Sequence, residues 1–228
     1  VLIDLKSQLN PNNEPFFQIN DMYIDGNDVY FCGHIGNYTT KEICYWKNGV
    51  KTTLSSNDSG SAYLMLVSNN ELYFTAQSNS GRGYYKNGVF TDETYYCAIY
   101  GLSKINNEVY LYGMKDSSLT GSNYQGYYKN LTTGISTYVS NVEIIRNLNG
   151  DNNNLYFNDG INFYTNNIPT TFFYSGVTGI IDFKIVNNNS YILSIEDTSD
   201  VNFYLDINNT NSMQINAADG EFTSILVL

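Results

Sequence analysis

The motif Tyr45-Trp46-Lys47-Asn48-Gly49-Val50 occurs more than once in this chain, and its repetition constrains the fold more than any other feature. It returns in full as Tyr84-Tyr85-Lys86-Asn87-Gly88-Val89 and in shortened form as Tyr127-Tyr128-Lys129-Asn130. Two aromatic residues followed by Lys-Asn-Gly predict a strand that ends in a tight turn, because Asn-Gly readily adopts the positive φ angles of hairpin turns. We therefore interpret the motif as a structural element rather than a ligand signature.

Each copy of the motif belongs to a longer repeat in which we expect four strands. An apolar strand is followed by an Asn/Asp/Gly turn, a strand with a central tyrosine, the motif strand, and a short strand rich in Thr and Ser. The second strands have anchor residues about 36 to 46 positions apart, at Tyr30, Tyr73, Tyr110, Tyr156 and Ile192. Four short strands at this period are typical of propeller blades.

We predict an all-β chain, a β-propeller of four-stranded antiparallel blades, in one domain of residues 1–228. Adjacent aromatic residues such as Tyr45 and Trp46 must point to opposite faces of a strand, which suits a sheet buried on both faces. The five repeats are expected over residues 19–58, 59–97, 98–141, 142–179 and 180–219. Terminal strands are expected at 1–5 and 222–228, so six blades remain an alternative to the preferred five.

Charge excludes several classes of partner. The chain has 22 acidic and 11 basic residues, for a net charge of -11, whereas nucleic acids and anionic membranes select basic patches. No apolar run approaches the roughly 20 residues of a membrane helix, so we expect no membrane insertion. The chain begins at Val1 rather than Met, which we interpret as processing or trimming. The oligomeric state is left open.

Three cysteines, Cys32, Cys44 and Cys97, are too few for a disulfide framework. Cys32 and Cys44 flank an expected hairpin and a disulfide across it is an alternative, but we favour two reduced, packed thiols.

Catalytic and metal sites find little support. His34 is the only histidine, so a Ser-His-Asp arrangement and a histidine metal site both lack residues. Asp25–Asp28 and Asp151–Asn154 superficially resemble calcium loops, but they occupy the positions where the repeats place turns, and we favour turn chemistry. We expect no cofactor and no metal.

A glycosidase is the catalytic alternative, because five-bladed propellers also support hydrolysis by paired carboxylates. The candidate acids lie in first strands of three different repeats, at Asp21, Glu143 and Asp182. No Arg or His accompanies them consistently, and acids near strand ends are usually solvated.

Binding is the preferred function. Tyrosine rings stack on apolar sugar faces and amides bond hydroxyls, and loops of variable length on a rigid scaffold are where ligands bind. The candidate ligand-binding residues are the loop residues Tyr38, Tyr124 and His34.

The apolar strand, Asn-Asn/Asp turn, Val29-Tyr30-Phe31-Cys32-Gly33 and Tyr45–Val50 motif together resemble repeats of bacterial extracytoplasmic β-propeller proteins, many of them uncharacterised. The resemblance covers about residues 19–215 and implies a secreted, periplasmic or surface-exposed propeller that binds a glycan or a protein partner. It carries over no catalytic residue. In architecture alone the chain is also similar to five-bladed lectins of the tachylectin type. A structural component of a surface assembly is a further alternative.

Overall fold

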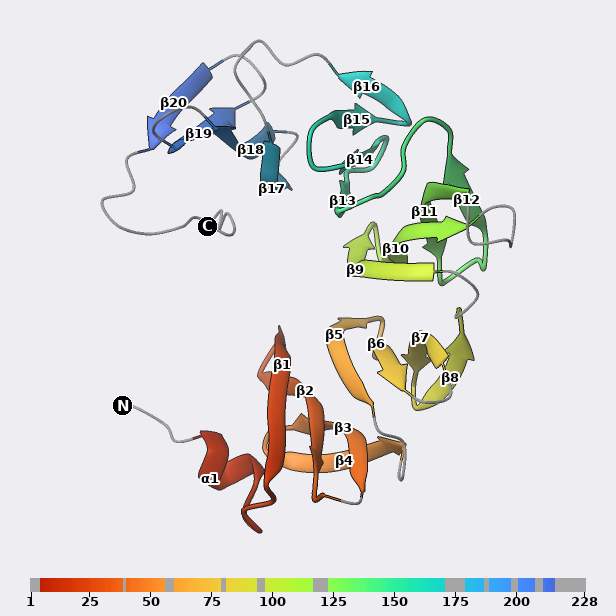
Figure 1. Ribbon diagram of the computed structural model, residues 1–228, viewed down its shortest axis with the longest axis vertical. Coiled ribbons are helices and arrows are strands. Elements are labelled where there is room, and N and C mark those ends of the chain that lie inside the picture. Colours follow the sequence, from red (N-terminus) through yellow and green to blue (C-terminus); the bar gives the residue numbers. More distant parts are fainter. Residues whose placement is uncertain are drawn as a thin grey trace. The chain divides into compact units, whose positions relative to one another are not determined.

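The computed structural model is built almost entirely of β-strands (Figure 1). It describes residues 5–38, 40–55, 60–78, 81–93, 97–116, 123–170, 179–186, 189–197, 201–207 and 211–215. These residues form five four-stranded sheets, each with its strands hydrogen-bonded in chain order, and every register that the structure gives is antiparallel. The predicted all-β chain of five four-stranded antiparallel blades is therefore confirmed.

We number the blades in chain order. Blade 1 contains β1 (Phe16–Asp25), β2 (Asp28–Gly36), β3 (Lys41–Lys47) and β4 (Val50–Ser55). Blade 2 contains β5 (Ser61–Ser68), β6 (Glu71–Ser78), β7 (Gly81–Lys86) and β8 (Val89–Asp92). Blade 3 contains β9 (Cys97–Ile105), β10 (Glu108–Asp116), β11 (Tyr124–Asn130) and β12 (Ser136–Val139). Blade 4 contains β13 (Asn147–Gly150), β14 (Leu155–Asn158), β15 (Phe163–Thr165) and β16 (Ile168–Thr170). Blade 5 contains β17 (Gly179–Val186), β18 (Asn189–Asp197), β19 (Val201–Ile207) and β20 (Asn211–Ile215).

The chain separates into two compact units, Val1–Leu102 and Ser103–Leu228, with the boundary inside β9. In the first unit, blades 1 and 2 share an apolar cluster that includes Cys32, Ile43 and Phe74. In the second unit, blades 3 and 4 share a cluster that includes Tyr112 and Phe157, while Phe163 of blade 4 packs against Phe183 of blade 5 with ring centroids 5.0 Å apart. Sheet-on-sheet packing thus buries the aromatic faces that the repeats supply.

The hairpin turns have the backbone geometry that their Asn-Gly and Asn-Asn pairs predict. Asn48 and Gly49 have φ angles of 49° and 84°, and Asn87 and Gly88 have φ angles of 50° and 84°. The same left-handed pair recurs at Asn69-Asn70, Asn106-Asn107 and Asn166-Asn167. Positive φ at both central residues is the requirement of a type I′ turn, which matches the twist of the flanking strands.

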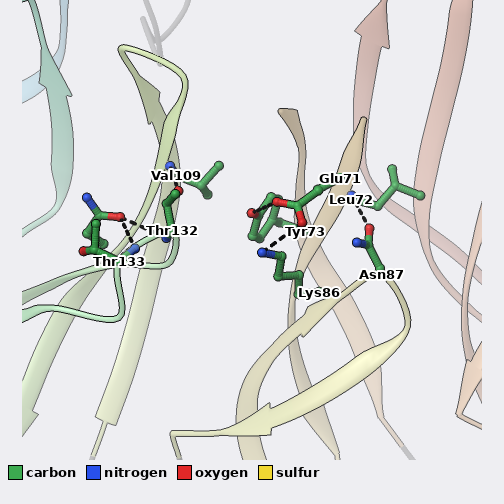
Figure 2. Close-up of polar contacts among 9 residues, drawn as sticks. Glu71, Leu72, Tyr73, Lys86, Asn87, Val109, Thr132 and Thr133 are labelled. Carbon is green, nitrogen blue, oxygen red and sulfur yellow. Dashed lines mark hydrogen bonds and ion pairs between the residues drawn. The ribbon is translucent and has the colours of Figure 1, made fainter. Parts of the chain in front are cut away.

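The polar end of the repeated motif ties two neighbouring turns of a blade together, as Figure 2 shows for blade 2. Lys86 Nζ lies 3.0 Å from Glu71 Oε1, and the Tyr73 hydroxyl donates a 2.7 Å hydrogen bond to Glu71 Oε2. The side-chain oxygen of Asn87 accepts a 2.9 Å hydrogen bond from the backbone N–H of Leu72. The motif therefore fastens the end of β7 to the start of β6.

Blade 1 repeats this arrangement and blade 3 varies it. In blade 1, Lys47 pairs with Asp28 at 2.7 Å, and Asn48 accepts a 2.9 Å hydrogen bond from the N–H of Val29. In blade 3, the hydroxyl of Thr132 accepts the corresponding hydrogen bond, at 3.4 Å, from the N–H of Val109 (Figure 2). The recurrent motif thus has the same structural role in blades 1 and 2, and a residue just after it takes over part of that role in blade 3.

The aromatic pair of the motif faces both sides of blade 1. Tyr45 stacks on Phe74 of blade 2 with ring centroids 5.1 Å apart. Trp46, on the opposite face, is fully buried and its indole N–H donates a 3.0 Å hydrogen bond to the backbone oxygen of Leu9. Leu9 belongs to the helix α1 (Leu5–Leu9), which covers this face of the sheet.

The terminal-strand prediction for residues 1–5 is wrong at Leu5, which begins α1 instead. The reason is the indole of Trp46, which is buried only if an apolar side chain packs on it and its N–H finds an acceptor. Leu9, the last residue of α1, provides the side chain and the backbone oxygen. Residues 1–4 and the predicted strand at 222–228 lie outside the described residues.

The first strand of blade 4 begins at Asn147, later than the predicted Val142. Two residues before it instead bond to blade 3: Val142 accepts a 2.5 Å hydrogen bond from the N–H of Gly126, and Ile145 donates a 3.0 Å bond to the oxygen of Gly113. Val142 and Ile145 are buried there. This apolar segment therefore fills the interface between blades 3 and 4 rather than extending the strand.

Cys32 and Cys44 are buried, reduced thiols, as favoured from the sequence. In the β2–β3 register Cys32 lies opposite Tyr45 and Cys44 opposite Gly33, so the two side chains fall on opposite faces of the sheet. Burial raises the pKa of the Cys32 thiol well above its usual range and that of Cys44 to about 12.

Candidate binding pockets

His34 lies in a polar network between blades 1 and 2. Its Nδ1 is 2.9 Å from the hydroxyl of Ser61, which also accepts a 2.6 Å hydrogen bond from the amide of Asn20. The Ser61 hydroxyl also donates a 3.3 Å hydrogen bond to the backbone oxygen of Ala62. Burial, with a smaller effect of Lys41, lowers the pKa of His34 and favours the neutral ring. His34 thus connects the two blades.

Asp21 performs a similar connection. It directly follows a bulge in β1, where the pairing with β2 shifts between Ile19 and Asp21. One oxygen accepts a 2.8 Å hydrogen bond from the N–H of Met22, and the other accepts a 2.9 Å bond from the N–H of Met65 in β5. Both oxygens therefore hold backbone in place.

Asp182 occupies the corresponding place in blade 5, after a bulge between Ile180 and Asp182. It is buried and accepts a 2.8 Å hydrogen bond from the N–H of Phe183 and a 3.4 Å bond from the amide of Asn147 in blade 4. Lys184 Nζ lies 3.6 Å from its other oxygen. Like Asp21, this carboxylate joins neighbouring blades.

Tyr38 is 85% exposed and its ring meets Phe16 edge-on, with centroids 5.1 Å apart. Lys41 Nζ lies 4.5 Å from the centroid of the same Phe16 ring. The three side chains form a small surface cluster at the β2–β3 connection.

A pocket of about 340 Å³ lies in the first unit between two half-exposed tyrosines, Tyr63 of β5 and Tyr100 of β9. Tyr63 is 46% exposed and Tyr100 is 43% exposed. Tyr63 is the extra residue of the bulge between Ala62 and Leu64, so it has no partner in the β5–β6 register. Tyr100 is at the same place in its repeat, since each tyrosine precedes the first residue of its Asn-Asn turn by the same number of positions.

The floor of this pocket is apolar and its rim is polar. Ala76 and Thr75 are buried beneath it, and the Thr75 hydroxyl is engaged by the N–H of Leu64 at 3.2 Å. At the rim, Arg82 Nη2 donates a 2.9 Å hydrogen bond to the side-chain oxygen of Gln77, its cross-strand neighbour. The arrangement offers aromatic faces, a guanidinium and an amide around one concave surface, which is the composition of a small-molecule site.

A second pocket, of about 450 Å³, lies in the second unit and is lined by Asn123, Tyr124, Gln125, Asn141, Val142 and Glu143. It brings together Tyr124, a predicted ligand-binding residue, and Glu143, a predicted carboxylate candidate. Glu143 is exposed, in contrast to Asp182 in the same unit. Of the six candidate residues, these two share a described pocket.

Sequence reasoning missed Tyr63 and Tyr100 because it assigned strand tyrosines to packing and looked for ligand contacts in loops. The available signal was their shared position before the Asn-Asn turns of repeats two and three, where blade 1 has Asn20 instead. At Tyr63 this position is a bulge, and the side chain is half-exposed.

Turn chemistry accounts for the Asp151 loop. Its Oδ1 accepts hydrogen bonds from the N–H groups of Asn153 and Asn154, at 2.8 and 2.9 Å. Within the described part of the chain, no group of three or more His, Cys, Asp or Glu side chains is placed to hold a metal ion.

The described helix is too short and too polar to cross a membrane. No family model matches this chain, and a search of curated proteins finds no match.

Proposed function

We propose that this protein is a non-catalytic glycan-binding module whose binding site is the pocket between Tyr63 and Tyr100. The observation that carries the proposal is the exposure of these two rings at equivalent positions, whereas motif aromatics such as Trp46 and Tyr85 are buried. Exposed aromatic faces beside directional polar groups suit sugar rings, which present apolar C–H faces and hydroxyl edges.

Each group at the pocket has a role in this proposal. Tyr63 and Tyr100 supply stacking faces, and Gln77 supplies an amide for a sugar hydroxyl. Arg82, whose guanidinium is positioned by its 2.9 Å hydrogen bond to Gln77, supplies a positive charge beside a ligand oxygen. None of the described residues that line the pocket carries a carboxylate, so the paired acids of a glycosidase have no counterpart among them.

The module would act where glycans are displayed, secreted or on a cell surface, as the resemblance of its repeats to extracytoplasmic propellers implies. A protein ligand presented to the same pocket is the competing possibility. Both fit a chain whose net charge of -11 disfavours nucleic acid.

A glycan array followed by calorimetry with the selected sugar tests the proposal. We expect binding to the array, and a loss of affinity of about tenfold or more in Tyr63→Ala, equivalent to about 1.4 kcal/mol. The matched control is Tyr138→Ala, because Tyr138 is 41% exposed, similar to Tyr63, and lies in the second unit.

Failure of the wild-type protein to bind any arrayed glycan would refute the function. Loss of binding in Tyr38→Ala with full binding in Tyr63→Ala would move the site to the β2–β3 connection. Melting temperatures of all variants separate lost binding from lost folding.

A further inference from the structure

The pocket at Tyr124 and Glu143 is built from two segments that approach each other at the edge of blade 3. Asn123, Tyr124 and Gln125 form one wall, at the start of β11. The other wall follows the end of β12 and contains Asn141, Val142 and Glu143. Residues close together in sequence thus form both walls, inside one compact unit.

The walls are fixed at their base. The N–H of Gly126 donates a 2.5 Å hydrogen bond to the oxygen of Val142, and the Val142 side chain is buried. Gly126 is required for this approach, because a Cβ there would lie 2.7 Å from Val142 Cγ1. The pocket is therefore preformed, and a ligand need not order its walls.

The start of β11 is held from the opposite strand as well. Asp116 of β10 is fully buried and lies opposite Tyr124 in the register. Its Oδ1 accepts a 3.3 Å hydrogen bond from the N–H of Asn123. Tyr124 and its neighbours therefore have a fixed position along the strand.

Among the described residues that line this pocket, the side chains combine one carboxylate, three amides and one aromatic ring, and none is basic. Lys115 lies opposite Gln125 in the register, but its Nζ sits 5.1 Å from the centroid of the Tyr127 ring. A carboxylate beside an aromatic face is the pair that binds an ammonium group, through an ion pair and a cation–π contact. Amides supply donors and acceptors for hydroxyls.

We propose that this pocket is a second binding site, selective for a small polyhydroxylated ligand that carries a protonated primary amine, such as a hexosamine unit with a free amino group. Glu143 pairs with the ammonium, Tyr124 lies against it, and Asn123, Gln125 and Asn141 bond the hydroxyls. The net charge of -11 favours a cationic ligand and disfavours an anionic one. This site belongs to the second unit and does not depend on the pocket of Tyr63 and Tyr100.

Calorimetric titration of the full chain with a β-1,4-linked glucosamine disaccharide, and with the same disaccharide N-acetylated, tests the proposal. At about pH 6 the free amines are protonated. We expect the free-amine sugar to bind at least about tenfold more tightly than the acetylated one, and added salt to weaken that binding, because a partly exposed ion pair is screened.

Glu143→Gln should remove the preference between the two sugars without changing the fold, because Glu143 is exposed. The matched control is Asp25→Asn, which removes the same charge from the exposed end of β1 in the first unit and should keep the preference.

Three results would overturn the proposal. They are equal affinities of wild-type protein for the two sugars, no binding of the free-amine sugar, or an equal loss in Asp25→Asn, which would indicate a general charge effect. The first two need no variant, so a folding defect in Glu143→Gln leaves the test intact.

Discussion

Truncating the side chain of Leu9 tests most directly whether α1 covers the face of blade 1 that carries Trp46. Its side chain is 3% exposed and packs with Trp46, whose indole N–H bonds to the Leu9 backbone oxygen. Leu9→Ala removes three buried carbon atoms, worth about 2.4 kcal/mol at roughly 0.8 kcal/mol each. Where a cavity remains after such a substitution, the total loss of folding stability is about 2–5 kcal/mol. Because α1 is short and can move to fill part of the cavity, we expect a loss of about 2–3 kcal/mol in the free energy of unfolding.

The assay is equilibrium unfolding in urea followed by tryptophan fluorescence, since Trp46 is the only tryptophan and reports on this contact itself. With an m-value of about 2 kcal/mol per molar urea, the expected loss lowers the midpoint by about 1–1.5 M. Leu5→Ala is the matched control: Leu5 is in the same helix but 40% exposed, and should cost less than about 0.5 kcal/mol. Equal midpoints for Leu9→Ala and wild type, or equal losses for the two variants, would refute the packing of α1 on Trp46.

Three further predictions concern turns, titration and thiols. Gly49→Val should cost about 1–3 kcal/mol through backbone strain alone, because its φ of 84° disfavours a β-branched residue while a Cβ there meets no atom within 4 Å; Gly49→Asn, which tolerates this conformation, should cost much less in urea unfolding. The pKa of His34 is lowered in the folded state, so the unfolded chain binds its proton first and stability should fall as pH drops below about 6.5. His34→Gln should remove that part of the slope in unfolding curves recorded across this range, and an unchanged slope would contradict a lowered pKa for the half-buried ring. In a Cys97→Ser background, Cys32 and Cys44 should react with a thiol reagent only after unfolding, because both thiols are buried with raised pKa values; rapid labelling of the native protein would contradict their burial.

The repeated motif made the blades predictable because its chemistry is local. Asn48-Gly49 and Asn87-Gly88 determine turn geometry within a few residues, and the aromatic pair determines that both faces are buried. Helix α1 could not be predicted in this way, because Leu5–Leu9 is held as a helix by a tertiary contact, the packing and hydrogen bond of Leu9 with Trp46. The same holds for Val142 and Ile145, whose apolar character fits a strand of blade 4 but whose backbone hydrogen bonds go to blade 3.

The candidate sites were less predictable, because exposure depends on bulges that a pattern of apolar residues does not reveal. The sequence pointed to Tyr124 through the adjacent long loop and to Glu143 as an acid, but not to their common pocket, which depends on the Gly126–Val142 contact. Asp21 and Asp182 were candidates for catalysis as acids of first strands. Next to their bulges, Asp21 instead accepts from the backbone N–H of Met65 in blade 2. Asp182 accepts from the N–H of Phe183 in its own strand and from the side-chain amide of Asn147 in blade 4. Tyr63 and Tyr100 lie in apolar strands, so the sequence pattern assigns them to packing, although both rings are half-exposed in the structure.

A crystal structure of the protein with its array-selected glycan tests most directly whether binding resides in strand tyrosines rather than in the repeated motif. We predict a sugar ring stacked on Tyr63 or Tyr100, with a hydroxyl or carboxylate bonded to Gln77 or Arg82. A sugar bound at the Lys86–Glu71 pair of the motif, or at Tyr38 and Phe16 with the Tyr63 pocket empty, would contradict that assignment.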